Sequence, residues 1–326
     1  MSCVLGLDGG GTKTVCVLMD DTSQVLGRGE AGPSNYQSVG KKAAFFSIQS
    51  AIAQAIASIR EVNVEAICLG LAGVDRPADI QIGRSFVEQL RLSDSGPIRW
   101  ALQPSNVVIC NDALIALVGG LGQARGIVAI AGTGSIIFGR NSQGCTKRVG
   151  GWGNILGDEG SAYSIAVQGM QAALRAYDGR GLPTSLQERL ILHLDLKSIE
   201  DLIEFVYRQG WKVKEIAALA PLVDEAAASG DKVALRIIED AVKELVQATQ
   251  VVIDAIFSPD EVFEVVTTGS VWHGKSKIRE RFEALIVTRS PFAKAILPRN
   301  EPAYGAGLLA LNALFKISDE KKYYFL

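Results

Sequence analysis

Two glycine-rich turns, each next to short apolar runs, constrain the fold of this chain more than any other feature. DGGGTKT at residues 8–14 follows an apolar run at 4–7, and AGTGS at residues 131–135 lies between apolar runs at 127–130 and 136–138. The pattern of apolar run, turn and apolar run indicates two strands joined by a hairpin. A unit that occurs twice predicts two similar halves, and we expect them to face each other across a cleft.

The composition narrows the class of protein. The chain has 326 residues, of which 34 are glycine and only 10 are proline, and 48% are hydrophobic. This length suits two domains, and abundant glycine suits the tight turns of an α/β protein. The formal net charge of −2 provides no basic field for nucleic acid, so we expect no nucleic-acid partner and predict a small-molecule ligand.

The sequence also argues against a membrane protein. No apolar stretch approaches the roughly 20 residues of a membrane span, and the chain starts on a strand-like run rather than a signal peptide. We therefore expect no membrane partner and a cytoplasmic location. The five cysteines form no CxxC pair and are expected to be buried thiols. Because His193 and His273 have no ligand-like spacing, no His/Cys metal site is predicted.

Hydrophobic periodicity predicts the remaining elements. A helix at 43–59 and buried strands at 65–71 and 107–110 complete a mixed sheet in the first part of the chain. Residues 161–257 show mainly helical spacing, and they are followed by a strand at 262–267. The second half therefore carries a helical insertion.

These elements divide the chain into two predicted domains. The first covers residues 1–115, and the second, with the helical insertion, covers residues 116–326. The sequence also predicts an apolar helix at 304–314, whose packing the pattern does not determine. A helix after about residue 315 could return to the first domain.

Both glycine turns are suited to binding phosphate. Three glycines let the backbone of the first turn approach an anion, while N–H groups and a threonine hydroxyl donate to it. The second turn supplies small residues and two hydroxyls at the equivalent place. The candidate cofactor-binding residues are Asp8, Gly10, Gly11, Thr12, Lys13, Thr133 and Gly134. The alternative is a pair of plain hairpin turns, and the first turn lacks the spacing of a Walker A or dinucleotide-binding loop.

A third glycine turn follows the predicted strand at 262–267, in the sequence TTGSVW. Gly269 would let a flat group such as adenine approach the backbone closely, and Ser270 lies next to it. The alternative is that Ser270 serves only as the N-cap of a helix.

Acidic residues stand where phosphoryl transfer would need them. Asp8 ends the first strand, Asp112 follows the strand at 107–110, and Asp158 and Glu159 lie in a glycine-rich loop. Carboxylates at strand ends point into the clefts of open α/β sheets. There they can hold Mg²⁺ through water or accept a proton from an attacking alcohol. For Asp112 the simpler alternative is a helix cap.

The loop at residues 150–161 suits a sugar. It contains five glycines, one tryptophan, one asparagine and two acids within 12 residues, a mixture unsuited to a packed core. A sugar offers an apolar ring face to an aromatic side chain and hydroxyls to polar ones. The alternative is an Ω-loop with Trp152 in the core. Asn35, in the sequence GPSNY, is a further candidate or an ordinary turn residue.

Five motifs together carry a family resemblance. They are, in chain order, DGGGTKT, NDALIA, AGTGS, GGWGNILGDEGSAYSIA and TTGSVW. With them the chain resembles the family that joins N-acetylglucosamine kinases with the ATPase subunits of benzoyl-CoA reductase-type activators. The resemblance spans almost the whole chain. It implies the fold of the sugar kinase, actin and heat-shock chaperone superfamily: two ribonuclease-H-like domains of α/β class that face a central nucleotide cleft.

The resemblance also implies roles for single residues, with ATP and Mg²⁺ as cofactors. Asp112 would be the catalytic base, and Asp8 would hold the water shell of Mg²⁺. The two glycine turns would bind phosphate, and Gly269 with Ser270 would lie on the adenosine side. The implied sugar contacts are Asn35, Asp112, Ser135, Gly151, Trp152, Gly153, Asn154, Ile155, Asp158 and, less directly, Glu159.

The activity implied by the resemblance is ATP-dependent phosphorylation of an amino sugar, above all N-acetyl-D-glucosamine at its 6-hydroxyl, by a protein that could be a homodimer. Ile136 stands where animal enzymes carry asparagine after GTGS, which leaves glucosamine or another hexose as alternative substrates. A nucleotide-driven switch or activator is another alternative, although the chain has no cysteine-rich loop for an iron–sulfur cluster. A sugar-sensing binding protein is the last, and the two acids Asp8 and Asp112 disfavour it.

Overall fold

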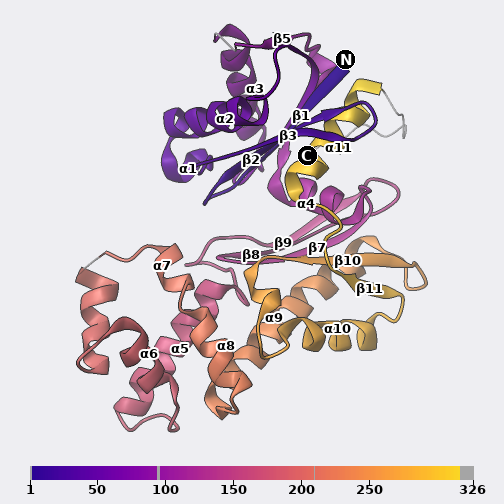
Figure 1. Cartoon of the computed structure of the whole chain (residues 1–326). Coiled ribbons are helices and arrows are strands. Elements are labelled where there is room, and N and C mark those ends of the chain that lie inside the picture. The colour runs from indigo at the N-terminus through magenta and orange to yellow at the C-terminus, as the bar shows by residue number, and fades with distance from the viewer. Residues whose placement is uncertain (1, 94–95, 209, 316–326) are drawn as a thin grey trace. The chain divides into compact units, whose positions relative to one another are not determined.

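Figure 1 shows the computed structural model of the chain, which describes residues 2–93, 96–208 and 210–315. The described chain forms two compact units, each built around one sheet and its helices. The first unit consists of Met1–Gly126, Arg140–Cys145 and the described residues from Pro298 onward, and the second consists of Ile127–Gly139 and Thr146–Leu297.

The first unit contains a six-stranded sheet in the order β3-β2-β1-β4-β5, with β6 also paired to β4. Its strands are β1 (Ser2–Gly9), β2 (Thr14–Asp20), β3 (Val25–Ala31), β4 (Val62–Leu71), β5 (Ile98–Trp100) and β6 (Val107–Asn111). Its helices are α1 (Tyr36–Val39), α2 (Lys41–Ala55), α3 (Pro77–Leu92), the 3₁₀ turn η1 (Pro104–Asn106), α4 (Asp112–Leu121) and α11 (Pro302–Phe315).

Three parallel strands of this sheet end in one row. β1 pairs with β4, and β4 pairs with β6, so that Gly9 lies opposite Leu71 and Leu71 lies opposite Asn111. Because parallel strands point the same way, the loops that follow them meet at one edge of the sheet. The residues beside this row, Asp8 and Asp112, are therefore brought to the same edge.

Alternation along β1 separates the two faces of the first sheet. Leu5 and Leu7 pack into the core that contains residues of α2 and α3. On the other face, a Cβ atom at Gly6 would lie 2.2 Å from the backbone nitrogen of Gly307, so α11 rests directly on the strand (Figure 1). A Cβ atom at Gly305 would likewise lie 2.3 Å from the nitrogen of Gly119, which brings α11 against α4. Asp8 shares the Gly6 face and thus lies on the side of these two helices.

The second unit repeats the strand connectivity of the first. Its sheet has the order β11-β10-β7-β8-β9, in which β10 is parallel to both β7 and β11. A three-strand meander next to a parallel strand is the arrangement of β1 to β4 as well. The strands are β7 (Gly126–Ala131), β8 (Ser135–Arg140), β9 (Thr146–Gly150), β10 (Phe263–Thr268) and β11 (Ala293–Ile296).

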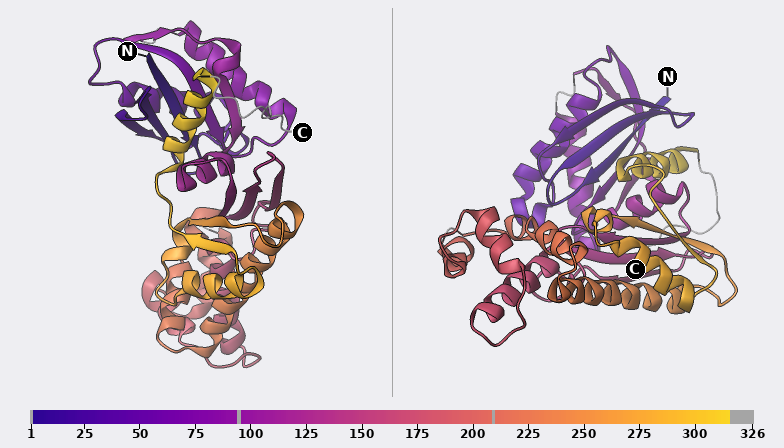
Figure 2. Two further views of the ribbon diagram at one scale, coloured as in Figure 1. Left: turned by 90° about the vertical axis from the view of Figure 1, so that its right-hand side faces the viewer. Right: turned by 60° about the horizontal axis from the view of Figure 1, so that its bottom comes forward.

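Helices of the second unit share one hydrophobic core with β7. They are α5 (Ala162–Tyr177), α6 (Leu186–Leu194), α7 (Val213–Ala217), α8 (Ala220–Ala228), α9 (Lys232–Ile256) and α10 (Ile278–Arg289), with the 3₁₀ turns η2 (Ile199–Asp201) and η4 (Ser270–His273) and the π-helical turn η3 (Glu204–Arg208). The N-cap of the long α9 is Asp231, whose carboxylate accepts from two backbone N–H groups of the first turn. It runs alongside α10 (Figure 2).

The structure confirms the α/β class and the two glycine hairpins, but it differs from several expectations. The units divide after Gly126 rather than after residue 115, because α4 packs on α11 and stays with the first sheet. The segment after about residue 315, where a returning helix was expected, lies outside the described residues. Residues 199–208, within the segment predicted to be mainly helical, are helical throughout but change from 3₁₀ to π geometry along their length.

Two further findings concern single residues and the chain as a whole. Four cysteines are buried as expected, but the prediction was wrong for Cys145, which is exposed because it lies in the polar turn between β8 and β9. Within the described ranges, no helix combines the length and apolar character that a membrane crossing requires.

Asp79 ties α3 to the start of α1. Its side chain is buried and accepts hydrogen bonds from the Tyr36 hydroxyl and from the backbone nitrogen of Arg76, at 2.5 and 2.9 Å. Burial alone would raise the pKa of Asp79, but these hydrogen bonds outweigh it and lower the pKa from 3.8 to about 2. The ionised carboxylate therefore stabilises this part of the first unit.

Asp79→Asn is expected to lower the free energy of unfolding by about 2 kcal/mol at neutral pH, the energy equivalent of this pKa shift. Because the folded-state pKa is the lower one, the contribution is complete above about pH 5 and is lost as the pH falls toward about 2. Urea unfolding at pH 7 and pH 3 should therefore show a clearly smaller deficit at the lower pH. Glu88→Gln, on the exposed side of the same helix, is the control. A deficit that does not change with pH would contradict the assignment.

Candidate functional site

In the turn between β1 and β2, backbone hydrogen bonds hold the base, whereas the tip is exposed. The Gly10 nitrogen donates to the carbonyl of Lys13 at 2.9 Å, and the Gly10 carbonyl accepts from the nitrogens of Ser34 and Asn35. Gly11 and Thr12 are exposed, and a Cβ atom at Gly11 would meet nothing within 4 Å. The tip thus keeps its backbone open to an anion, as the glycine pattern predicts.

Asp8 and Asp112 form an electrostatically coupled pair at the edge of the first sheet. Burial, above all, and then the charge of Asp112 raise the pKa of Asp8 from 3.8 to about 7, with Glu301 adding to the shift and Lys13 opposing it. Two carboxylates so close together in a partly buried place repel each other unless a proton or a cation intervenes. Their oxygens are the donors that a hard cation such as Mg²⁺ prefers, so these residues fit that ion.

Asp112 is not the cap of its helix. α4 begins at Asp112, but the N-cap is Asn111, whose side-chain oxygen accepts from the nitrogen of Ala113 at 2.7 Å. The side-chain nitrogen of Asn111 also donates to Asp75 at 3.0 Å. The capping alternative is therefore wrong for Asp112, whose carboxylate lies at the positive end of α4 next to Asp8.

Asn35 lies close to the loop after β4. It caps α1, because its side-chain oxygen accepts from the nitrogen of Gln37 at 3.1 Å. The side chain of Gln37 in turn donates to the carbonyl of Gly73 at 2.8 Å. Asn35 therefore has the turn role considered as its alternative, and it also stands beside the segment that leads to Asp75.

Asp75 is a residue that the sequence reasoning missed. It follows β4 and is exposed, and it accepts from Asn111 next to Asp112. It is an acid a few residues beyond a buried strand, the same pattern that singled out Asp112. That pattern could have placed it among the candidates.

In the second unit, two predicted turns touch each other. Gly132 lies in the β7–β8 turn, where a Cβ atom would stand 3.9 Å from the Cα of Gly269. Gly269 itself has φ +111°, and a Cβ atom there would lie 2.3 Å from the carbonyl oxygen of Ala131. Ser270 follows at the start of η4, whose N-cap is Gly269. The alternative that Ser270 is only an N-cap is therefore wrong.

The loop after β9 is tied to the β7–β8 turn by residues expected to contact sugar. The Ser135 hydroxyl donates to the carbonyl of Glu159 at 2.7 Å. Asp158 is buried at φ +61°, with its carboxylate directly against Gly134. Burial raises the pKa of Asp158, although backbone N–H groups of Ser135 and Gly153 oppose the shift. Ser135 and Asp158 thus brace this loop.

Trp152 lies outside the core. Trp152 is 69% exposed, so the alternative of an Ω-loop with Trp152 in the core is wrong. The Arg148 guanidinium lies 5.0 Å from the centre of its ring and donates to the carbonyl of Gly151 at 2.7 Å. Ile155 is exposed as well. Gly153 and Asn154 lie between these two residues in the chain, and Gly151 precedes Trp152. An exposed aromatic face with polar neighbours is an arrangement that can hold a sugar ring.

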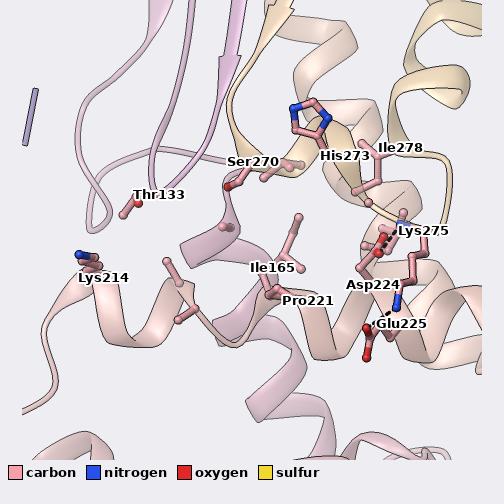
Figure 3. A pocket seen from close by; sticks show the side chains of 17 residues that line it. Thr133, Ile165, Lys214, Pro221, Asp224, Glu225, Ser270, His273, Lys275 and Ile278 are labelled. Atoms are coloured by element: carbon pink, nitrogen blue, oxygen red, sulfur yellow. Dashed lines mark hydrogen bonds and ion pairs between the residues drawn. The ribbon is translucent and has the colours of Figure 1, made fainter. Parts of the chain in front are cut away.

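A pocket of about 530 Å³ opens beside the two touching turns of the second unit (Figure 3). Thr133 and Ser270 line it together with apolar residues such as Ile165, Pro221 and Ile278. This volume and apolar lining suit a nucleoside-sized ligand. The part of the wall that α7 and α8 supply has no local signal in the sequence, because that segment shows only helical spacing.

Asp224 shapes the far wall of this pocket. Its carboxylate, on α8, accepts from the backbone nitrogens of Lys275 and Ser276 at 2.6 and 3.1 Å and from the Ser276 hydroxyl. Gly274 packs on it so closely that a Cβ atom there would lie 2.4 Å from a carboxylate oxygen. A buried carboxylate with three donors fixes the segment after η4 in place.

The chain is similar to known proteins over nearly its whole length. The profile of the BadF/BadG/BcrA/BcrD ATPase family matches residues 5–310. A protein of Clostridium acetobutylicum named N-acetylmuramic acid/N-acetylglucosamine kinase is 36% identical over 95% of this chain and 98% of its own length. A protein of Dictyostelium discoideum named N-acetyl-D-glucosamine kinase is 37% identical with the same two coverages.

Solved structures show the same fold. A Chromobacterium violaceum protein assigned as an N-acetylglucosamine kinase aligns with a TM-score of 0.75 at 24% identity, over 94% of this chain and 98% of its own. A glucokinase of the ROK family from Streptomyces griseus, in complex with glucose and AMPPNP, aligns with a TM-score of 0.55 at 18% identity, over 95% and 97% of the two chains. The two sheets thus follow the actin-like ATPase fold of sugar kinases.

Gly269→Ala is expected to destabilise the second unit by at least about 2 kcal/mol, because it adds a steric clash to an unfavourable φ. Gly230→Ala is the matched control, since Gly230 also has positive φ (+94°) but faces open space. The control should lose only about 1 kcal/mol. Thermal and urea unfolding of both variants measure the difference, and equal losses would disprove the close approach of the two turns.

Proposed function

The chain belongs to the BadF/BadG/BcrA/BcrD ATPase family, and on this premise we propose that it is an ATP-dependent kinase of N-acetyl-D-glucosamine. The names of the two relatives that match over nearly the full length support this substrate. The observation that carries the proposal is the pair of carboxylates, Asp8 and Asp112, beside a glycine turn open to phosphate. The proposed acceptor is the 6-hydroxyl of the sugar.

Asp112 is the proposed catalytic base. As the sugar oxygen forms its bond to the γ-phosphorus and the bond to the ADP oxygen breaks, the Asp112 carboxylate accepts the hydroxyl proton. Asn111 supports this role because it takes over the helix cap and holds the first turn of α4. Each unit offers a glycine turn, at residues 11–13 in the first and at Thr133–Gly134 in the second, whose backbone N–H groups would stabilise charge on phosphate oxygens.

Asp8 is the proposed anchor for Mg²⁺, through water. When bound, the ion would neutralise charge on the phosphate groups of ATP. The fit rests on the oxygen donors of Asp8 and Asp112 and on the repulsion between these two acids, which adds to the effect of burial in raising the pKa of Asp8. Lys13 stands in the same turn, but its ammonium pairs with Glu30 at 3.2 Å.

The pocket of the second unit is the proposed nucleoside site. Gly269 and Ser270 present backbone at close approach, and the apolar walls suit the faces of adenine. Asn35 and the loop at residues 151–159 are the proposed sugar contacts, in which Trp152 offers its ring face and Asn154 and Glu159 offer polar groups. Ser135 and Asp158 would act mainly by holding this loop, given their internal hydrogen bonds and burial.

The first test is a coupled assay of ADP release with ATP and a panel of sugars: N-acetyl-D-glucosamine, N-acetylmuramic acid, glucosamine and glucose. Asp112→Asn is expected to lower kcat by about 10²- to 10⁴-fold, because it removes the base, with little change in sugar binding. Asp21→Asn, an exposed acid in the turn after β2, should keep full activity. An active Asp112→Asn enzyme, or no sugar-stimulated ADP release, would defeat the proposal.

The second test concerns the cation. Chelation with EDTA is expected to abolish turnover, and added Mg²⁺ should restore it. Asp8→Asn should raise the Mg²⁺ concentration needed for half-maximal activity by about tenfold or more, since one charge of the anionic pair is lost. Titration of activity against Mg²⁺ for wild type, Asp8→Asn and Asp21→Asn measures this. An unchanged Mg²⁺ requirement in Asp8→Asn would remove Asp8 from the site.

A further inference from the structure

Two lysines line the pocket of the second unit, and they differ in their partners. Lys275 is paired with Glu225 at 2.6 Å, and this carboxylate raises the pKa of Lys275. The side chain of Lys214, on α7, has no hydrogen bond or ion pair with any residue that the structure describes. Among the lining residues, the positive charge of Lys214 is therefore the one that a ligand could still meet.

The two lysines also mark different ends of the pocket. In Figure 3, Lys214 and Thr133 lie at one end, and the group of Asp224, Glu225 and Lys275 lies at the other. Ser270 and Ile165 are drawn between the two ends. Because Thr133 belongs to the β7–β8 turn, the end with Lys214 is the one next to the turn assigned to phosphate.

We propose that Lys214 binds the phosphate chain of the nucleotide in this pocket. The proposal rests on the nucleotide site argued above and adds a residue that comes from the helical insertion rather than from a sheet. The helical insertion would then have two roles. It would line the pocket for the adenine base, and through Lys214 it would favour a charged nucleotide over a nucleoside.

Lys214 combines an exposed positive charge with a small desolvation cost for ligand binding. The ammonium of Lys214 is exposed, so bringing it to a phosphate costs little desolvation beyond what the ligand itself loses. Lysine is a flexible point charge with three donors, which suits a phosphate chain. Hydrogen bonds between charged partners are about twice as strong as neutral ones. In contrast, Lys275 already forms an ion pair with Glu225 at the opposite end of the pocket.

The test is the binding of ATP, ADP and adenosine to the full-length protein, measured by isothermal titration calorimetry. Lys214→Met is expected to weaken ATP and ADP about tenfold, as one lost charge-assisted hydrogen bond would, and to leave adenosine within about twofold. Lys214→Arg should retain most of the ATP affinity. Lys212→Met is the matched control, because Lys212 is exposed two residues away and does not line the pocket.

The outcomes separate this inference from the function on which it rests. If the wild-type protein binds ATP and Lys214→Met binds it equally well, the inference is overturned and the kinase assignment stands. Equal weakening of all three ligands would also overturn it, because Lys214 would then act on the wall of the base pocket. If the wild-type protein does not bind ATP, the proposed function fails, and this inference fails with it.

Discussion

The repulsion between Asp8 and Asp112 is the interaction on which the chemistry of the first unit depends. The repulsion results from the strand pairing. The strands β1, β4 and β6 end at the same edge of the sheet, and Asp8 and Asp112 both lie next to that edge. Burial of Asp8, together with the nearby charge of Asp112, raises the pKa of Asp8 to about 7. Such a place favours a cation and a proton-accepting carboxylate side by side, which are the two requirements of phosphoryl transfer to an alcohol.

Close backbone contacts at glycine hold that arrangement. α11 rests on β1 at Gly6 and crosses α4 at Gly305, and in each place a Cβ atom would overlap with backbone. The helix that carries Asp112 is thereby fixed against the strand that carries Asp8. In the second unit, Gly269 has the corresponding role for the two turns beside the pocket that Thr133 and Ser270 line. These glycines thus serve packing as well as turn geometry, and their contacts come from segments far apart in the chain.

In the second unit, some polar side chains are held by protein partners, while others are left exposed. Ser135 and Asp158, which the family resemblance puts in contact with sugar, have internal hydrogen bonds or burial that hold the loop. Trp152 is left exposed and held by Arg148. In the pocket, Asp224 and Lys275 are engaged with protein partners, and Lys214 is not. Whether a polar residue of this unit is available to a ligand is thus decided by which neighbours already satisfy it.

By itself the sequence determined the local features of this protein. Turn chemistry and periodicity predicted the two glycine hairpins and most helices, and the repeat predicted two related sheets. Strand-end acids pointed to Asp8 and Asp112. Only the tertiary structure decided that Asn111 caps α4, that α4 stays with the first unit, and that Lys214 and Asp224 line one pocket. The physical reason is that hairpins and helices form between neighbours in sequence, whereas burial, charge pairing and cavity walls depend on side chains brought together from distant segments.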